Sequence, residues 1–292
     1  MRIAILLSTC SLLAAAPATA QDGPPVETTS AAPAPAPAIQ GTVFDGDWLS
    51  IGIGAAYSPS YDGSDDYVVS VLPLVQGSLG GVGINPRPRG LALDFIPDAA
   101  SGPGLDLGIA ARVRANRSRQ IKDPVVASLG ELKTAIEVGP TVGVTLPRVL
   151  HGFDSLSFTL DTRWDVAGAH RGMVIDPSVT YFTPLNRGTI ASLSLGAEYV
   201  DGDYADYYYS VDAAGSAVSG LPTFDAGSGF TKASATMLLG FDLDGDATNG
   251  GLALVVLGGY SRMLGDARRT PLTSIRGDAN QWLVAAGIGY TF

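Results

Sequence analysis

The chain has 292 residues, of which 46% are hydrophobic, and a formal net charge of −10. An acidic chain of this kind is not expected to bind nucleic acid, because the phosphate backbone selects basic surfaces. The single cysteine, Cys10, lies in the N-terminal leader, so a disulfide framework or a thiolate metal site is excluded from the mature protein.

Residues 1–20 are predicted to be a secretory signal peptide. Arg2 precedes an apolar run over residues 3–13, and Ala18-Thr19-Ala20 forms a cleavage site of the A-x-A type. A lipoprotein signal built on Leu7-Ser8-Thr9-Cys10 is the alternative, but Thr9 is bulky before the cysteine and the apolar run continues past it. The chain is therefore expected to be exported.

Residues 21–44 are predicted to be a periplasmic linker, since they are rich in Pro and Ala and cannot build a core. A single domain follows over residues 45–292, because no second break of this kind divides it. Beyond the signal, no stretch approaches the ~18 to 20 apolar residues that a membrane helix requires.

The predicted domain consists of alternating strands. Over residues 136–146 apolar side chains occupy one face, while Glu137 and Thr141 lie on the other, and residues 156–166 repeat the pattern. A period of two over about 9 to 11 residues suits a tilted membrane strand. A soluble sandwich also alternates, so the choice of a barrel depends on the repetition, the 37 glycines and the chain end.

Twelve alternating segments are predicted, which makes the fold class all-β: a transmembrane antiparallel up-and-down β-barrel. They cover approximately residues 48–57, 67–78, 80–86, 89–96, 104–115, 133–147, 155–167, 172–183, 188–200, 231–243, 251–263 and 281–292. An even number places both ends in the periplasm and the long connections outside. Segments 80–86 and 89–96 are short, and a count without them gives ten.

The last segment carries a predicted assembly signal. Trp282, Ile288, Tyr290 and Phe292 alternate with small or less bulky residues. This resembles the terminal strand by which the barrel assembly machinery recognises outer-membrane barrels, and an ordinary last strand is the alternative. Aromatic side chains also suit the two edges of a membrane.

The inner face of the predicted barrel is polar. Its charged candidates are Asp106, Arg112, Arg114, Glu137, Asp161, Arg163, Asp165, Asp176 and Glu198. Selective pores usually carry rings of one sign, whereas both signs occur here. A narrow, ion-paired lumen is therefore predicted, with an open channel as the alternative.

No catalytic residue, metal site or cofactor is predicted. The two histidines are His151 and His170, and no strand plainly offers a serine to His170, so we expect a polar turn histidine rather than the base of a lipid hydrolase. Residues 242–246 suggest a calcium loop, but Ala247 and Ala253 stand where such a loop needs glycine and glutamate.

Two outer connections are chemically distinctive. Residues 201–230 are acidic and contain several tyrosines, and we expect them to form an ordered cap. Arg117, Arg119 and Lys122 are expected to meet the phosphates of lipopolysaccharide. Outer-membrane lipid is thus an expected partner.

Three motifs carry a family resemblance. They are Tyr61-Asp62-Gly63-Ser64-Asp65-Asp66-Tyr67, Ser219-Gly220-Leu221-Pro222-Thr223-Phe224-Asp225-Ala226-Gly227-Ser228-Gly229 and Gly289-Tyr290-Thr291-Phe292. Together with the barrel pattern they resemble the MipA/OmpV family of outer-membrane proteins, the MltA-interacting protein family, over residues 48–292. Phe224 departs from the family, which usually has tyrosine there.

The resemblance implies a non-enzymatic barrel in the outer membrane of a Gram-negative bacterium. Family members are described as scaffolds between a lytic murein transglycosylase and a murein synthase, and others as osmotic-response porins or adhesins. The leading hypothesis is a scaffold that contacts these peptidoglycan enzymes. A passive channel for small solutes is the alternative, and a barrel lipid hydrolase is the third.

Overall fold

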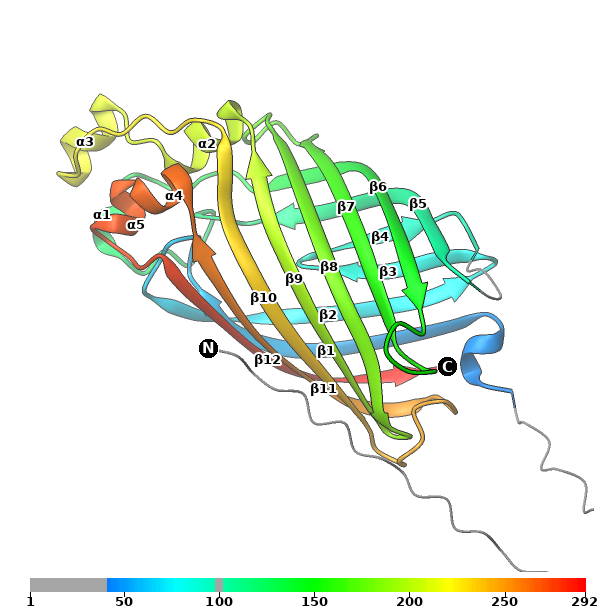
Figure 1. Ribbon diagram of the computed structural model, residues 1–292. Coiled ribbons are helices and arrows are strands. Elements are labelled where there is room, and N and C mark those ends of the chain that lie inside the picture. The colour runs from blue at the N-terminus through cyan, green and yellow to red at the C-terminus, as the bar shows by residue number, and fades with distance from the viewer. Residues whose placement is uncertain (1–40, 98–101) are drawn as a thin grey trace, which may run out of the picture. The chain divides into compact units, whose positions relative to one another are not determined.

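The computed structural model describes residues 41–97 and 102–292. The predicted signal peptide and residues 21–40 of the predicted linker lie outside the described residues. The described chain forms a closed antiparallel barrel of twelve strands, in which each strand pairs with its neighbours in sequence and β1 pairs with β12 (Figure 1). The predicted up-and-down barrel and its strand number are confirmed.

The strands follow the alternating segments of the sequence closely. They are β1 (Trp48–Pro59), β2 (Tyr67–Leu79), β3 (Val82–Arg87), β4 (Gly90–Asp94), β5 (Gly104–Arg114), β6 (Ala135–Pro147), β7 (Ser155–Asp165), β8 (Met173–Asn186), β9 (Thr189–Val200), β10 (Gly229–Asp242), β11 (Gly251–Met263) and β12 (Asn280–Thr291). The helices are η1 (Val43–Asp45), α1 (Pro124–Ala127), α2 (Gly202–Tyr209), α3 (Ala213–Ser219), α4 (Gly265–Arg269) and α5 (Pro271–Ser274). None of the described helices is long and apolar enough to cross a membrane.

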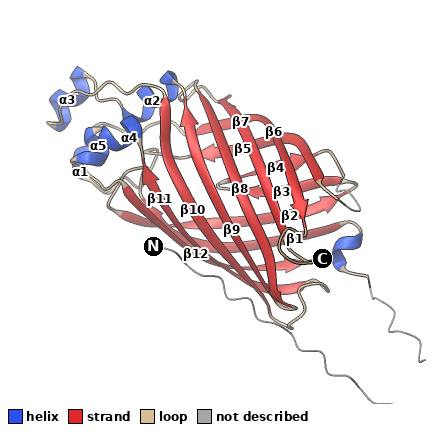
Figure 2. Ribbon diagram, in the orientation of Figure 1, coloured by secondary structure: helices blue, strands red, loops and turns tan. Residues whose placement is uncertain are grey.

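The two ends of the barrel differ. Helices α1 to α5 lie in long connections that gather at one end, whereas short turns such as that between β8 and β9 lie at the other (Figure 2). Long connections of bacterial outer-membrane barrels face outward, so we call the two ends outer and periplasmic. Val43, inside the predicted linker, donates its backbone N–H to Thr248 O (2.9 Å) in the periplasmic turn between β10 and β11.

The outward face of the barrel is apolar. Large side chains at alternate strand positions are exposed, among them Val71, Leu105 and Val284. Trp282, Ile288, Tyr290 and Phe292, the predicted assembly signal, all belong to this exposed set. Because almost all strands pair on both sides along their length while the outward face exposes hydrocarbon, the barrel suits a lipid surrounding rather than water.

The seam between β1 and β12 depends on glycine. A Cβ added at Gly54 would lie 2.5 Å from the carbonyl oxygen of Ala286, so the two strands approach too closely for a side chain. Gly54→Val is therefore expected to destabilise the closed barrel by about 1–3 kcal/mol. Gly258→Val is the matched control, because a Cβ at Gly258 meets nothing within 4 Å. Heat-modifiable migration on gels would measure the folded fraction, and equal fractions for both variants would contradict the prediction.

The wall is less regular at β3 and β4. In Figure 1 their hairpin stops part-way along the longer β2. It pairs with β2 at the three positions Gly77, Ser78 and Leu79, whereas β1 pairs with β2 along the whole strand. The outer part of β2 thus has a strand partner on one side only, which is β1.

Candidate functional site

An ion-pair network crosses the lumen near the outer end and begins at two arginines of β5. Arg112 donates through Nε to Glu137 Oε2 (3.1 Å) and through Nη2 to Glu198 Oε2 (2.8 Å). Arg114 contacts the same two carboxylates, with its Nη2 2.7 Å from Glu198 Oε2. Since β5 and β9 are not neighbours, these pairs span the lumen.

Arg163 of β7 extends the network. Its Nη1 donates to Asp161 Oδ2 (2.9 Å), and its Nη2 pairs with Asp176 of β8. Arg87 of β3 reaches the same Asp161 Oδ2 (2.9 Å). The hydroxyl of Thr141 donates to the other oxygen of Asp161 (2.6 Å). Two arginines and a threonine therefore hold one carboxylate.

Lys232 of β10 and Asp62 of the connection between β1 and β2 complete the network. Lys232 Nζ lies 3.4 Å from Asp62 Oδ2 and 3.5 Å from Glu198 Oε1. Asp62 Oδ2 also lies 3.7 Å from Arg114 Nη1. The contacts thus join β10 and an outer connection to β5 and β9.

Charge is balanced within the network. Its basic members are Arg87, Arg112, Arg114, Arg163 and Lys232, and its acidic members are Asp62, Glu137, Asp161, Asp176 and Glu198. Arg163, Glu137 and Glu198 are almost completely buried. The side chains of the network pack against one another across this section of the lumen, and each buried charge requires its partner.

His170, in the turn between β7 and β8, joins the network from the outer side. Its Nδ1 accepts the backbone N–H of Gly172 (3.0 Å), so Nε2 carries the proton of the neutral ring. That Nε2 lies 3.3 Å from Glu137 Oε1. The expected turn position is correct, but the side chain is buried, and no hydroxyl of the described residues is hydrogen-bonded to it.

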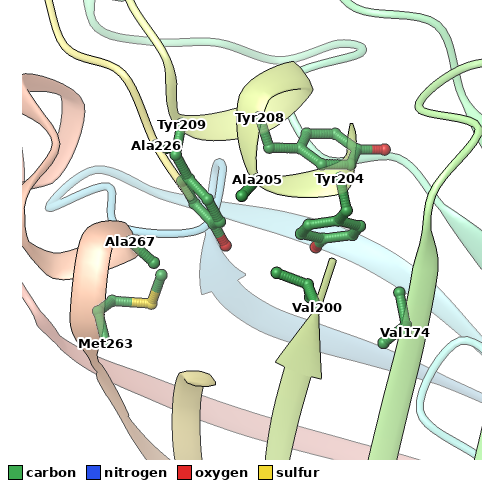
Figure 3. Packing of buried hydrophobic residues seen from close by; sticks show 9 residues of the cluster. All are labelled: Val174, Val200, Tyr204, Ala205, Tyr208, Tyr209, Ala226, Met263 and Ala267. Carbon is green, nitrogen blue, oxygen red and sulfur yellow. The ribbon is translucent and has the colours of Figure 1, made fainter. Parts of the chain in front are cut away.

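A tyrosine cap lies directly above the network. Asp201 accepts the backbone N–H of Tyr204 (3.1 Å) and so starts α2, from which Tyr204, Tyr208 and Tyr209 project into a buried cluster at the barrel rim (Figure 3). The Arg114 guanidinium lies 4.8 Å from the Tyr204 ring centroid, a cation–π contact. Burial raises the pKa of Tyr204 well above its usual range, so the phenol stays neutral. The cap predicted for residues 201–230 is thus built largely by α2.

A second contact fastens the outer connections to each other. Asp123 accepts the backbone N–H groups of Val125 and Val126 at the start of α1. It also accepts Nη2 of Arg276 (2.6 Å), which precedes β12. Burial alone would raise the pKa of Asp123, but Arg276 and the two backbone donors outweigh burial and hold the pKa below its usual value.

Asp123→Asn is expected to lower the melting temperature at neutral pH but not at strongly acidic pH. Because the folded pKa is depressed, the ionised carboxylate stabilises the fold above the unfolded pKa of about 4. This contribution disappears as the pH falls through the lower, folded pKa. Melting curves at a series of pH values would measure the difference from wild type, with exposed Asp203→Asn as the control. A difference that persisted unchanged at acidic pH would contradict the prediction.

Most of the predicted inner-face residues meet in the network. These are Arg112, Arg114, Glu137, Asp161, Arg163, Asp176 and Glu198. Asp106 lies farther from the outer end, paired with Gly143 in the ladder of β5 and β6. Asp165 instead accepts the backbone N–H groups of Ala167 (2.9 Å) and Arg171 (3.0 Å) and closes a turn.

Sequence reasoning missed Arg87, Lys232, Asp62 and His170 as members of the network. The alternation of their strands places Arg87 and Lys232 on the inner face, so this signal was present. Nothing local marks Asp62, which lies in a connection. Arg117, expected to meet lipopolysaccharide, is buried, and its Nη1 donates to Tyr208 O (3.3 Å). Its charge therefore serves the cap.

The acidic turn between β10 and β11 is held by its own backbone. Asp242 Oδ1 accepts the N–H groups of Asp244 (3.0 Å), Gly245 (2.9 Å) and Asp246 (3.1 Å). Within residues 41–97 and 102–292, no group of three or more His, Cys, Asp or Glu side chains is arranged to hold a metal ion.

Comparison with known proteins gives one family. The model of the family described as MltA-interacting protein MipA matches residues 51–292. No curated protein matches the chain. Among solved structures, an outer membrane channel from Pseudomonas putida F1 has a TM-score of 0.41 and 12% identity, covering 85% of this chain and 96% of that chain. OmpT of Vibrio cholerae has a TM-score of 0.35 and 6% identity, covering 84% and 97%. Similarities this weak do not bear on function.

Proposed function

Because the chain belongs to the MltA-interacting protein MipA family and is a β-barrel of the Gram-negative outer membrane, we propose that it is a non-enzymatic scaffold for murein enzymes. The expected partners are a lytic transglycosylase of the MltA kind and a murein synthase. Both act in the periplasm, so the periplasmic end of the barrel is the surface that would hold them.

The ion-pair network across the lumen and the tyrosine cap above it are the observations that favour a scaffold over a channel. A passive channel needs a continuous aqueous path, whereas Glu137 and Glu198 in the network are almost completely buried. Tyr204 and Tyr208 cover the same section from outside. We expect a lumen obstructed in this way to leave the external surfaces, rather than the lumen, available for function.

The turn between β6 and β7 offers a contact surface at the periplasmic end. Its Leu150 and Phe153 side chains are 76% and 81% exposed. Asp154 fixes the turn, because its carboxylate accepts the backbone N–H of Leu150 (2.9 Å) and the hydroxyl of Tyr181 (2.8 Å). A rigid turn that presents two large apolar side chains suits a protein partner, because little ordering entropy is lost on binding.

Affinity capture from solubilised envelope would test this proposal. Wild-type protein is expected to retain a lytic transglycosylase, and Leu150→Asp/Phe153→Asp is expected to lose it. Val218→Asp is the matched control, because Val218 is equally an exposed apolar residue but lies in α3 at the outer end. Failure of the wild-type protein to retain any murein enzyme would overturn the proposal. Loss of binding in the Val218→Asp control would show that the turn between β6 and β7 is not the specific contact surface.

A further inference from the structure

The barrel wall has an opening beside β2. From Tyr67 to Gln76, no strand of the described chain pairs with β2 on the side that faces β3. Pro73 lies within this stretch and suits an edge, because proline has no N–H to donate. Unpaired backbone is not tolerated against bare hydrocarbon, so this edge needs a cover.

A second copy of the barrel does not supply this cover symmetrically. Two copies inserted in the same direction are related by a rotation about the membrane normal. This rotation would set the lipid face of one β2 beside the lumen face of the other. The two edges therefore cannot continue as one sheet with a shared lipid face.

A crevice lies at the outer end of this edge. It has a volume of about 450 Å³ and is formed by β2, the end of β1 and residues 120–122 of the connection between β5 and β6. Tyr57, Tyr67, Val69 and Ile121 give it an apolar lining. The rings of Tyr57 and Tyr67 are stacked, with centroids 5.1 Å apart. Aromatic and aliphatic groups at the outer edge of a membrane suit a lipid chain.

One cation lines the crevice, and another is close to it in the sequence. Lys122 lines it, and its Nζ donates to the carbonyl oxygen of Tyr67 (2.6 Å). Lys122 and Arg119, which precedes the lining residue Gln120 in the chain, are both exposed. Although Asp66 precedes Tyr67, neither cation forms an ion pair with a carboxylate of the described residues. Both positive charges are thus available to an external anion.

We infer that this crevice binds an anionic lipid of the outer leaflet, with an acyl chain against Tyr57, Val69 and Ile121 and a phosphate beside Lys122 and Arg119. The exposed Val69 and Tyr57 side chains face outward, so the crevice opens toward lipid. Phosphate oxygens form charge-assisted hydrogen bonds with such cations. The polar headgroup, rather than the acyl chain, would supply partners to the outer part of the β2 edge.

Lipid A binding to the full-length mature protein in detergent would test the site, measured by native mass spectrometry. Lys122→Gln keeps an N–H donor for Tyr67 O but removes the charge, and Ile121→Asp places a carboxylate in the apolar lining. Each is expected to bind lipid A about tenfold more weakly than wild type. Lys133→Gln is the matched control: it removes an exposed lysine of the same connection that does not line the crevice, and it should bind as wild type does.

Three results would overturn the inference. The first is that lipid A binds Lys122→Gln and Ile121→Asp as tightly as wild type. The second is that lipid A binds Lys133→Gln as weakly as Lys122→Gln, which would indicate a general effect of surface charge. Alternatively, sodium oleate rather than lipid A would show the dependence on Lys122 and Ile121, which would assign the crevice to free fatty acids. Heat-modifiable migration would establish that each variant is folded before binding is measured.

Discussion

Glu137→Gln is expected to lower the free energy of unfolding by about 3–5 kcal/mol, the range for breaking a buried ion pair. The Glu137 side chain is fully buried and contacts Arg112, Arg114 and Arg163. Its neutralisation leaves three guanidinium groups around a site that has lost its negative charge, and two of them, on Arg114 and Arg163, are almost completely buried.

Urea unfolding in detergent micelles, followed by tryptophan fluorescence, would measure this loss. Glu131→Gln is the matched control, because Glu131 is exposed in an outer connection and its neutralisation is expected to leave the midpoint unchanged. If Glu137→Gln unfolded at the same urea concentration as Glu131→Gln, the network would not be a stabilising element of the fold.

A barrel that lacks the tyrosine cap and part of the ion-pair network is expected to conduct ions. The variant replaces residues 202–228 by a short Gly-Ser linker, which removes the tyrosine cap, and carries Arg114→Ala and Glu198→Ala, which remove one positive and one negative charge. Because the remaining network keeps its charge balance, the barrel should fold, while the lumen loses two large side chains near its outer end.

Planar-bilayer recording is expected to show discrete conductance steps for this variant and none when only the cap is removed. The comparison separates the two closures, since the network alone should still fill the lumen. Equal conductance after removal of the cap alone would assign the closure to α2, and a silent combined variant would show that other side chains close the barrel.

The strand pattern was predictable because the alternation has a physical cause. Each strand places successive side chains on opposite faces, so Val142 faces lipid while Thr141 faces the lumen, and the sequence reports the face directly. The polar residues of β5 to β9 could be assigned to the lumen on this ground. Their membership in one network could not be predicted, because the alternation shows which face of the sheet a side chain occupies but not its depth in the barrel or its partner.

Other features depend on contacts that the sequence does not reveal. In the sequence, His170 looks like a residue of a solvated turn. Its burial results from packing against Tyr204, whose ring centroid lies 4.9 Å from that of His170. Tyr204 follows 34 positions later in the sequence. The short pairing of β2 with β3 was also not predictable, since nothing in the sequence of β2 marks the position at which its neighbour stops pairing with it. Asp165 is the opposite case. Its place on the polar face predicted a lumen residue, but its carboxylate accepts backbone N–H groups of a turn.

The closed lumen is tested most directly by recording the wild-type barrel in a planar bilayer at neutral pH. With the ion-pair network and the tyrosine cap both in place, insertion should produce no stable conductance at any applied voltage that the bilayer survives. Reproducible conductance steps from the unmodified protein would contradict the closed barrel and would favour a passive channel instead.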